Sequence, residues 1–295
     1  MPAINMKKSL SKNQLQKEII TLAQISSVTK LRKTVNARDI IQQFISALNS
    51  GAIRSAEKDT KGVWITNTWV KEGILVCMRF GVITGMSGKT ETLQFADKDT
   101  FPLRSTDFTI ENIRIVPGGS SIRDGSFIGK GVIMMPPAYI NTGAYVGEGT
   151  MLDSHSLVGS CAQVGNRCHI SAGAQIGGVL EPVNASPCIV EDDVLMGINS
   201  SIAEGVILRK RVLLVPGVNI TSATPVYDLI KQKVYKATDA TPLEIPEGAI
   251  VVNGTRPKDD NKFALEQWIQ IQVPVIIKYR DKRTDLKTLL EEALR

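Results

Sequence analysis

The chain has 295 residues, of which 43% are hydrophobic and 22% charged, which is typical of a soluble protein with a sizeable core. Its net charge is +6, but aromatic residues make up only 5% of the chain and do not interleave with Lys/Arg clusters, which argues against nucleic-acid binding. No stretch approaches the roughly 20 apolar residues of a membrane span. The opening MPAINMKKSL also lacks the apolar run of a signal peptide.

The four cysteines show no CxxC pairing and no metal-ligand spacing with either histidine. We therefore expect reduced cysteines in core or turn positions of a cytoplasmic protein, and we expect no metal site. They are Cys77, Cys161, Cys168 and Cys188.

Residues 1–107 are expected to form a mostly helical first domain. Apolar residues recur at helical spacing over 12–26, and Asn36 is placed to cap a second helix that ends before Gly51. The apolar and β-forming runs 63–69 and 74–80 suggest a hairpin-like piece. The polar, Pro-containing stretch 97–107 is interpreted as a linker.

From Ile122 to Ile220 an aliphatic residue or Met recurs every six positions. Such a period fits neither an α-helix nor a two-sided strand; it predicts the hexapeptide repeat of a parallel β-helix, here over 108–225. Three repeats make one coil, and each coil buries its inward face only against its neighbours. The sixteen anchors are Ile122, Ile128, Met134, Ile140, Val146, Leu152, Val158, Val164, Ile170, Ile176, Val190, Met196, Ile202, Leu208, Leu214 and Ile220.

The rhythm breaks once, because 176 to 190 spans fourteen residues rather than twelve, which indicates an extruded loop. Beyond the repeats, 226–295 is expected to be a small C-terminal α/β segment. It should contain short strands within 226–235 and 249–253, and a closing helix over 284–294 capped by Thr284.

Several phrases are more specific than the period. They are Gly51–Lys58, Trp69–Glu72, Ile113–Pro117, Ala144–Asp153, Val158–Gly165, Ile176–Asn184, Glu204–Ile207 and Val251–Gly254. Together they closely resemble the tetrahydrodipicolinate N-succinyltransferase family of bacterial lysine and diaminopimelate biosynthesis. The resemblance implies a left-handed coil, a homotrimer with sites between subunits, and acyl-CoA as co-substrate rather than a permanently bound cofactor. The acceptor would be a small dicarboxylate.

The resemblance also implies roles for individual residues. Arg114 would bind an acceptor carboxylate, for which its planar, permanently charged fork is suited. Asp153 would orient the acceptor nitrogen and accept its proton. The backbone at Gly177 and Gly178 would lie close to the reacting centre, where N–H groups can stabilise an oxyanion.

His155 is the rival base, since many hexapeptide acyltransferases use a histidine, whereas we expect His169 to be structural. Asn199 and Ser201 are expected to contact substrate. The expected CoA contacts are Gly177, Gly178, Ala174 and Arg256.

The chain departs from the family in 197–201, where Gly-Ile-Asn-Ser-Ser replaces Gly-Ala-Arg-Ser-Glu, so Asn199 and Ser201 replace charged residues. A family Asp-Glu-Gly has also become Gly147-Glu-Gly149. Succinyl-CoA has a terminal carboxylate and acetyl-CoA does not, so the donor stays open. An acetyl-transferring relative of tabtoxin biosynthesis is one alternative; a non-catalytic scaffold and an acyltransferase acting on nucleotide sugars are others.

Overall fold

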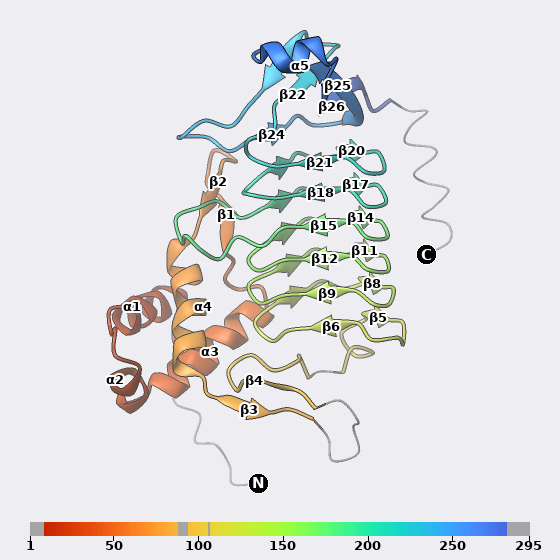
Figure 1. The fold of residues 1–295 in the computed structure, drawn as a ribbon. Coiled ribbons are helices and arrows are strands. Elements are labelled where there is room, and N and C mark those ends of the chain that lie inside the picture. The colour runs from red at the N-terminus through yellow and green to blue at the C-terminus, as the bar shows by residue number, and fades with distance from the viewer. Residues whose placement is uncertain (1–8, 88–93, 106, 282–295) are drawn as a thin grey trace.

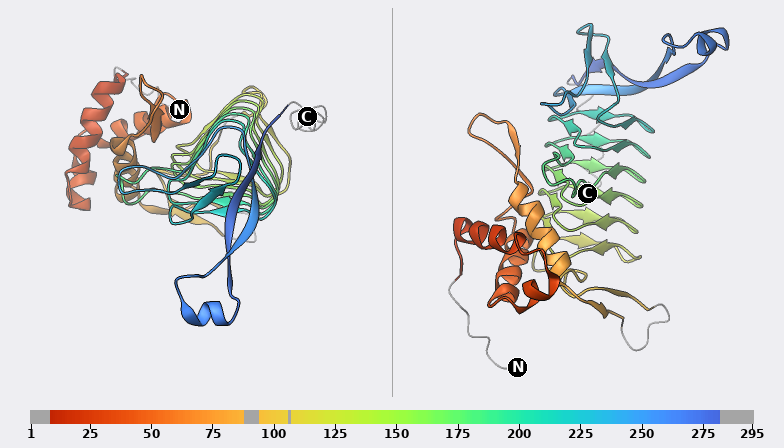
Figure 2. Two further views of the ribbon diagram at one scale, coloured as in Figure 1. Left: turned by 90° about the horizontal axis from the view of Figure 1, so that it is seen from above. Right: turned by 60° about the vertical axis from the view of Figure 1, so that its left-hand side comes forward.

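The structure is a computed structural model that describes residues 9–87, 94–105 and 107–281. Most of the chain forms three parallel sheets wound into a triangular coil, with a helical unit along one edge and a projecting arm at one end (Figure 1; Figure 2). The prediction of a mainly β fold with an N-terminal helical part is therefore confirmed. The expected helix over 284–294 lies outside the described residues.

Each sheet stacks strands from successive coils in register. In the regular repeats strand partners lie eighteen residues apart, as Tyr145 and Gln163 do, and the pairs that span residues 177–188 lie twenty-six apart, as His169 and Leu195 do. The first sheet contains β6 (Ser121–Ile122), β9 (Tyr139–Ile140), β12 (Leu157–Val158), β15 (Gln175–Ile176), β18 (Ser201–Ile202) and β21 (Asn219–Ile220). The second contains β7 (Phe127–Ile128), β10 (Tyr145–Val146), β13 (Gln163–Val164), β16 (Ile189–Val190), β19 (Ile207–Leu208) and β24 (Glu244–Ile245).

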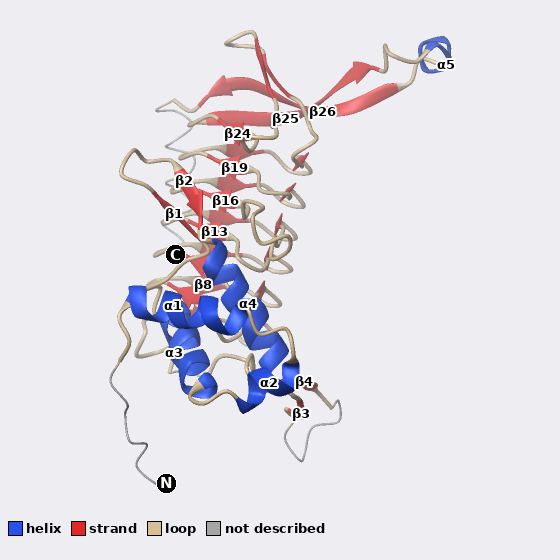
Figure 3. Ribbon diagram, turned by 90° about the vertical axis from the view of Figure 1, so that its left-hand side faces the viewer, coloured by secondary structure: helices blue, strands red, loops and turns tan. Residues whose placement is uncertain are grey.

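The third sheet continues into the C-terminal segment. Its coil strands are β5 (Arg114–Ile115), β8 (Ile133–Met134), β11 (Met151–Leu152), β14 (His169–Ile170), β17 (Leu195–Met196) and β20 (Leu213–Leu214). It then adds β25 (Ala249–Pro257), β26 (Gln270–Tyr279), β22 (Val226–Asp228) and β23 (Lys233–Tyr235). The long pair β25–β26, with α5 (Lys262–Glu266) at its tip, forms the arm (Figure 3).

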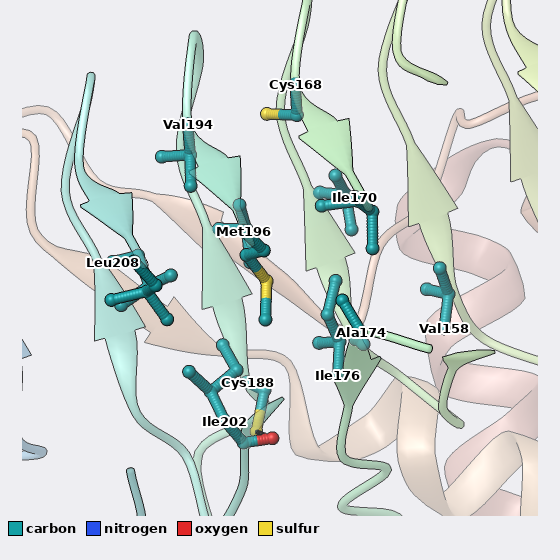
Figure 4. Close-up of a cluster of buried hydrophobic side chains, with 14 of the residues drawn as sticks. Val158, Cys168, Ile170, Ala174, Ile176, Cys188, Val194, Met196, Ile202 and Leu208 are labelled. Atoms are coloured by element: carbon teal, nitrogen blue, oxygen red, sulfur yellow. Dashed lines mark hydrogen bonds between the residues drawn. The ribbon is translucent and has the colours of Figure 1, made fainter. Parts of the chain in front are cut away.

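The sixteen anchors all lie in one buried column inside the coil, as predicted from their spacing. Figure 4 shows part of this column, where Ile170 and Met196 come from successive coils of one sheet. The smaller residues four positions after many anchors fill the corners, and Ala162, Ala174 and Val194 are almost completely buried there. Stacking therefore supplies every coil with its apolar partner surface.

The break in the rhythm is one corner enlarged. Only residues 159–162 join β12 to β13, but residues 177–188 join β15 to β16. The predicted extruded loop is therefore present, and no coil strand lies between β15 and β16. The interval is a single step with eight residues inserted, and we call 177–188 the corner loop.

The helical unit contains α1 (Lys12–Ala23), α2 (Val28–Lys33), α3 (Ala37–Asn49) and α4 (Thr68–Phe80), followed by the hairpin of β3 (Ile83–Gly85) and β4 (Ala96–Lys98). The predicted strand over 74–80 is wrong, since this run belongs to α4. Its buried residues Val70, Ile74 and Cys77 recur at helical spacing and pack against the other helices, and this tertiary contact outweighs their β-forming tendency. No helix among the described residues is long and apolar enough to span a membrane.

The helical unit is attached to the coil at the corner between the first and second sheets. Ser55 donates a hydrogen bond to the carbonyl of Cys161, 2.7 Å away, and Cys161 belongs to the helical core. Above this contact, β1 (Ala56–Lys58) and β2 (Trp64–Thr66) form a ribbon beside the coil. Lys58 pairs with Glu191 across 2.7 Å. Burial opposes ionisation of Glu191, but hydrogen bonds from Lys58 and Trp64 outweigh burial and hold its pKa below the ordinary value.

Gly73 allows α4 to approach α3 closely. A Cβ atom at this position would lie 2.4 Å from the ring of Phe44, which is fully buried and packs edge-on against Trp69. We expect Gly73→Ala to lower the free energy of unfolding by about 1–2 kcal/mol, because overpacking exceeds the gain in helix propensity. Urea denaturation checks this. Gly85→Ala is the control, since no atom lies within 4 Å of its added Cβ. A Gly73→Ala variant as stable as the parent would contradict the packing argument.

Candidate active site

The outward face of the third sheet carries a straight column of side chains. Because the strands pair in register, Arg114, Ile133, Met151, His169 and Leu195 follow one another along this face. Neighbouring strands are about 4.8 Å apart. The column therefore brings residues from five successive strands onto one surface.

Asp153 and His169 meet at the edge of this face. Asp153 follows β11 at the corner between the third and first sheets, and His169 begins β14 in the next coil. The Nε2 atom of His169 lies 2.8 Å from Oδ2 of Asp153. Their side chains are 17% and 24% exposed, so the pair is partly desolvated and still reachable from solvent.

His169 was expected to be structural, and its contact with Asp153 makes it a functional candidate that the motif comparison missed. The repeat predicts this neighbour. One regular coil is eighteen residues long, so His169 lies beside Met151 in the next coil, and Met151 is two residues before Asp153. Applying the coil length to every polar residue near Asp153 would have found it.

His155 and Asn199 lie at turn positions with a left-handed backbone, with φ of 62° and 55°. Gly173 occupies the same turn in the coil between them, with φ of 69°. Its missing side chain leaves room for Asn199, whose Oδ1 would lie 2.1 Å from a Cβ atom there. His155 is exposed, and among the described residues no hydrogen bond or ion pair joins its side chain to Asp153, whose partner is His169. Turn geometry thus accounts for both residue types, since Asn and His tolerate this conformation better than most.

Arg114 is exposed on β5, two strands from Asp153 and three from His169 along the same face. At the spacing of parallel strands these steps are about 10 and 14 Å between backbones. Arg114 therefore shares a face with the Asp153–His169 pair but does not touch it.

Gly177 and Gly178 begin the corner loop at a different corner, between the first and second sheets. They lie so close to the coil below that a Cβ atom at Gly178 would be 2.6 Å from the backbone nitrogen of Ser160. The N–H groups of Gly177 and Val179 donate to Ile202 and Ser160. Gly178 is exposed, and within the part of the chain that the structure describes its N–H has no hydrogen-bond acceptor. Gly178 thus presents a free backbone donor.

The remaining predicted residues lie apart from one another. Ser201 faces outward on β18 and donates to Oδ1 of Asn219, 2.6 Å away. Ala174 is fully buried in the coil core (Figure 4), and both its backbone groups bond within the coil. Arg256 lies near the far end of β25 in the arm, where it pairs with Asp259 across 3.2 Å. The structure brings neither Ala174 nor Arg256 to the Asp153–His169 pair.

The arrangement suits proton transfer. A carboxylate that contacts an imidazole fixes the ring orientation and stabilises its charged form, which makes the pair an effective general base. A backbone N–H without an acceptor can stabilise a developing oxyanion. Such groups serve enzymes that activate a nucleophile against a carbonyl, and acyl transfer is a reaction of that class.

Comparisons with known proteins define the family. Residues 14–80 match the family model described as the N-terminal part of tetrahydrodipicolinate N-succinyltransferase. The 2,3,4,5-tetrahydropyridine-2,6-dicarboxylate N-succinyltransferase of Herminiimonas arsenicoxydans is 43% identical over 88% of this chain and 89% of that protein. The enzyme of the same name from Enterobacter sp. is 40% identical over 94% and 93%. The chain belongs to the tetrahydrodipicolinate N-succinyltransferase family, so the prediction of an acyltransferase is confirmed.

Substitution at the Asp153–His169 pair should separate the two candidate histidines. Asp153→Asn keeps the size of the side chain but cannot take a proton, so kcat for acyl transfer should fall roughly 10²–10⁴-fold. His169→Gln should cause a similar loss, because it removes the imidazole that the carboxylate contacts. Steady-state kinetics measures both.

His155→Asn is the matched control, since Asn retains the left-handed turn. It should keep kcat close to that of the parent. If His155→Asn loses activity while His169→Gln keeps it, His155 is the base and the pair is structural.

Proposed function

We propose that this chain transfers an acyl group from a CoA thioester to the nitrogen of tetrahydrodipicolinate, with Asp153 and His169 as the general base. The contact between Asp153 and His169 on a partly exposed corner carries the proposal. The family's relatives, named for succinyl transfer to this dicarboxylate, support the choice of acceptor.

The reaction needs no acylated residue, because a thioester is already activated. Tetrahydrodipicolinate is a cyclic imine whose nitrogen carries no proton, so water first adds across its C=N bond and leaves a ring N–H. This nitrogen then attacks the thioester carbon while the Asp153–His169 pair takes its proton. The free N–H of Gly178 stabilises the oxyanion, and the C–S bond then breaks and releases CoA, which recovers the proton. Holding donor and acceptor together supplies much of the rate.

The site requires a second copy of the chain. Asp153 and Gly178 lie at different corners, separated within one chain by the width of the first sheet, six residues or roughly 20 Å. Two neighbouring copies in a homotrimer can bring one chain's Asp153 corner beside the other's Gly178 corner. We propose this trimer, and we propose that the coil is left-handed as in the family. The chain would then have three parts, residues 1–107, 108–225 and 226–295.

The four cysteines, which are free and buried, support a reducing cytoplasmic location.

The donor is succinyl-CoA or acetyl-CoA. The relatives' names favour succinyl transfer. The uncharged Asn199 and Ser201 favour acetyl transfer, because neither supplies a cation for a succinyl carboxylate. The contacts of CoA with Ala174 and Arg256 stay predictions.

Release of thiol from each CoA thioester tests the function directly. We expect release only when tetrahydrodipicolinate is present, with a kcat/KM preference of at least about tenfold for one donor, as loss of a charged contact implies. Omission of acceptor is the control for hydrolysis. Absence of acceptor-dependent release with both donors would refute the proposed function and favour a scaffold.

Arg114→Ala tests binding of the acceptor. Because Arg114 is proposed to hold a carboxylate in both ground and transition states, its loss should raise the acceptor KM roughly 10–100-fold, from about 1.5–3 kcal/mol for a charge-assisted bond. The donor KM should stay unchanged. Arg123→Ala is a control, since this arginine pairs with Asp97 instead. A variant that loses CoA binding and keeps the acceptor KM would contradict the assignment.

A further inference from the structure

A buried lysine of the helical unit holds the corner loop. Lys71 lies on α4 and is fully buried. Its Nζ donates to the carbonyl of Ala185 across 2.8 Å and to that of Pro182 across 3.1 Å. Both acceptors belong to the corner loop, so one side chain joins the helical unit to the loop that begins with Gly177 and Gly178.

A second contact acts on the same loop. Leu180 packs against the core of the helical unit. It lies between Gly178 and the carbonyls that Lys71 binds, and on the other side Val179 donates to Ser160 of the coil. The first half of the corner loop is therefore held from both sides, by the helical unit and by the coil.

Lysine is a costly choice for this position if its role is only to stabilise the fold. Burial lowers the pKa of Lys71, because it removes water from the ammonium group. No carboxylate among the described residues forms an ion pair with it; its acceptors are backbone carbonyls. An apolar side chain of similar length would avoid this desolvation, and such replacements are often neutral or stabilising. The carbonyls of the loop would then turn to water, since Glu181 and Pro182 are exposed.

We propose that Lys71 is a positioning residue for the acyl donor: its ammonium group clamps the corner loop so that the free N–H of Gly178 is held in place for the CoA thioester. This inference rests on the proposed function, because it assigns Gly178 to the donor. The helical unit thereby acts on the site without touching substrate. Holding a loop in its bound conformation strengthens binding by removing the cost of ordering it.

Lys71→Met tests the clamp in the full-length chain. CoA binding should weaken roughly tenfold by titration calorimetry, as expected when a loop must be ordered on binding. The amides of 178–187 should exchange hydrogen faster, whereas the acceptor KM and the exchange of the helices should not change. The urea midpoint should stay the same or rise.

Lys71→Gln keeps a hydrogen-bond donor without the charge, so it should restore part of the CoA affinity. Lys17→Met, on the exposed face of α1, is the control.

The outcomes separate the clamp from a purely structural role. A Lys71→Met variant with parental CoA affinity and parental hydrogen exchange in the loop overturns the proposal. A variant that binds CoA more weakly and also has a lower urea midpoint overturns it too, because loss of stability then accounts for the weaker binding. If Lys71→Met fails to fold, Leu180→Ala replaces it, because it loosens the same loop from the same unit and should give the same pattern. If the parent binds CoA but transfers no acyl group, the proposed function fails and the CoA affinities still decide the clamp. If the parent binds no CoA, both are overturned.

Discussion

The stacking of coils is the constraint on which the rest of the molecule depends. Each strand of the coil is two residues long and has one inward side chain, so no coil can bury its apolar face alone. In-register pairing, at eighteen residues in the regular coils and twenty-six across the corner loop, places the anchors of successive coils on one another. The same pairing turns the outward positions into columns, which is how Asp153 and His169, sixteen residues apart, come into contact.

The corners are where this regular structure accommodates function. A strand must keep its register, but a corner tolerates insertion because it lies on the surface and adds no residue to the core. The coil uses this freedom between β15 and β16 and again between β21 and β24, where residues 221–243 carry β22 and β23. The corner loop that results reaches the helical unit, where Lys71 and Leu180 hold it. The helical unit, which lies outside the coil, thus contacts the loop proposed to receive the donor.

Some of the site could be predicted from sequence and some could not. Asp153, Gly177 and Gly178 stand in phrases that the family shares, and their positions on the coil follow from the repeat. His169 has no such phrase, and only the coil length relates it to Asp153. Lys71 stands in the phrase Trp69–Glu72, but its contact could not be predicted, because its partners are carbonyls more than a hundred residues away and backbone acceptors leave no pattern in the sequence. The helix over 74–80 was missed for a related reason, since contact with Phe44 outweighs local preference.

The sequence by itself determined the coil, its inward residues and the place of the corner loop. These follow from a period of six, which is a local property repeated sixteen times. Tertiary structure decided which polar groups meet: His169 with Asp153, Lys71 with the corner loop, and Glu191 with Lys58. Such contacts depend on which coil, corner or neighbouring unit lies beside a residue. A hydrogen bond is made by proximity in space, and the chain alone specifies that proximity only through the completed fold.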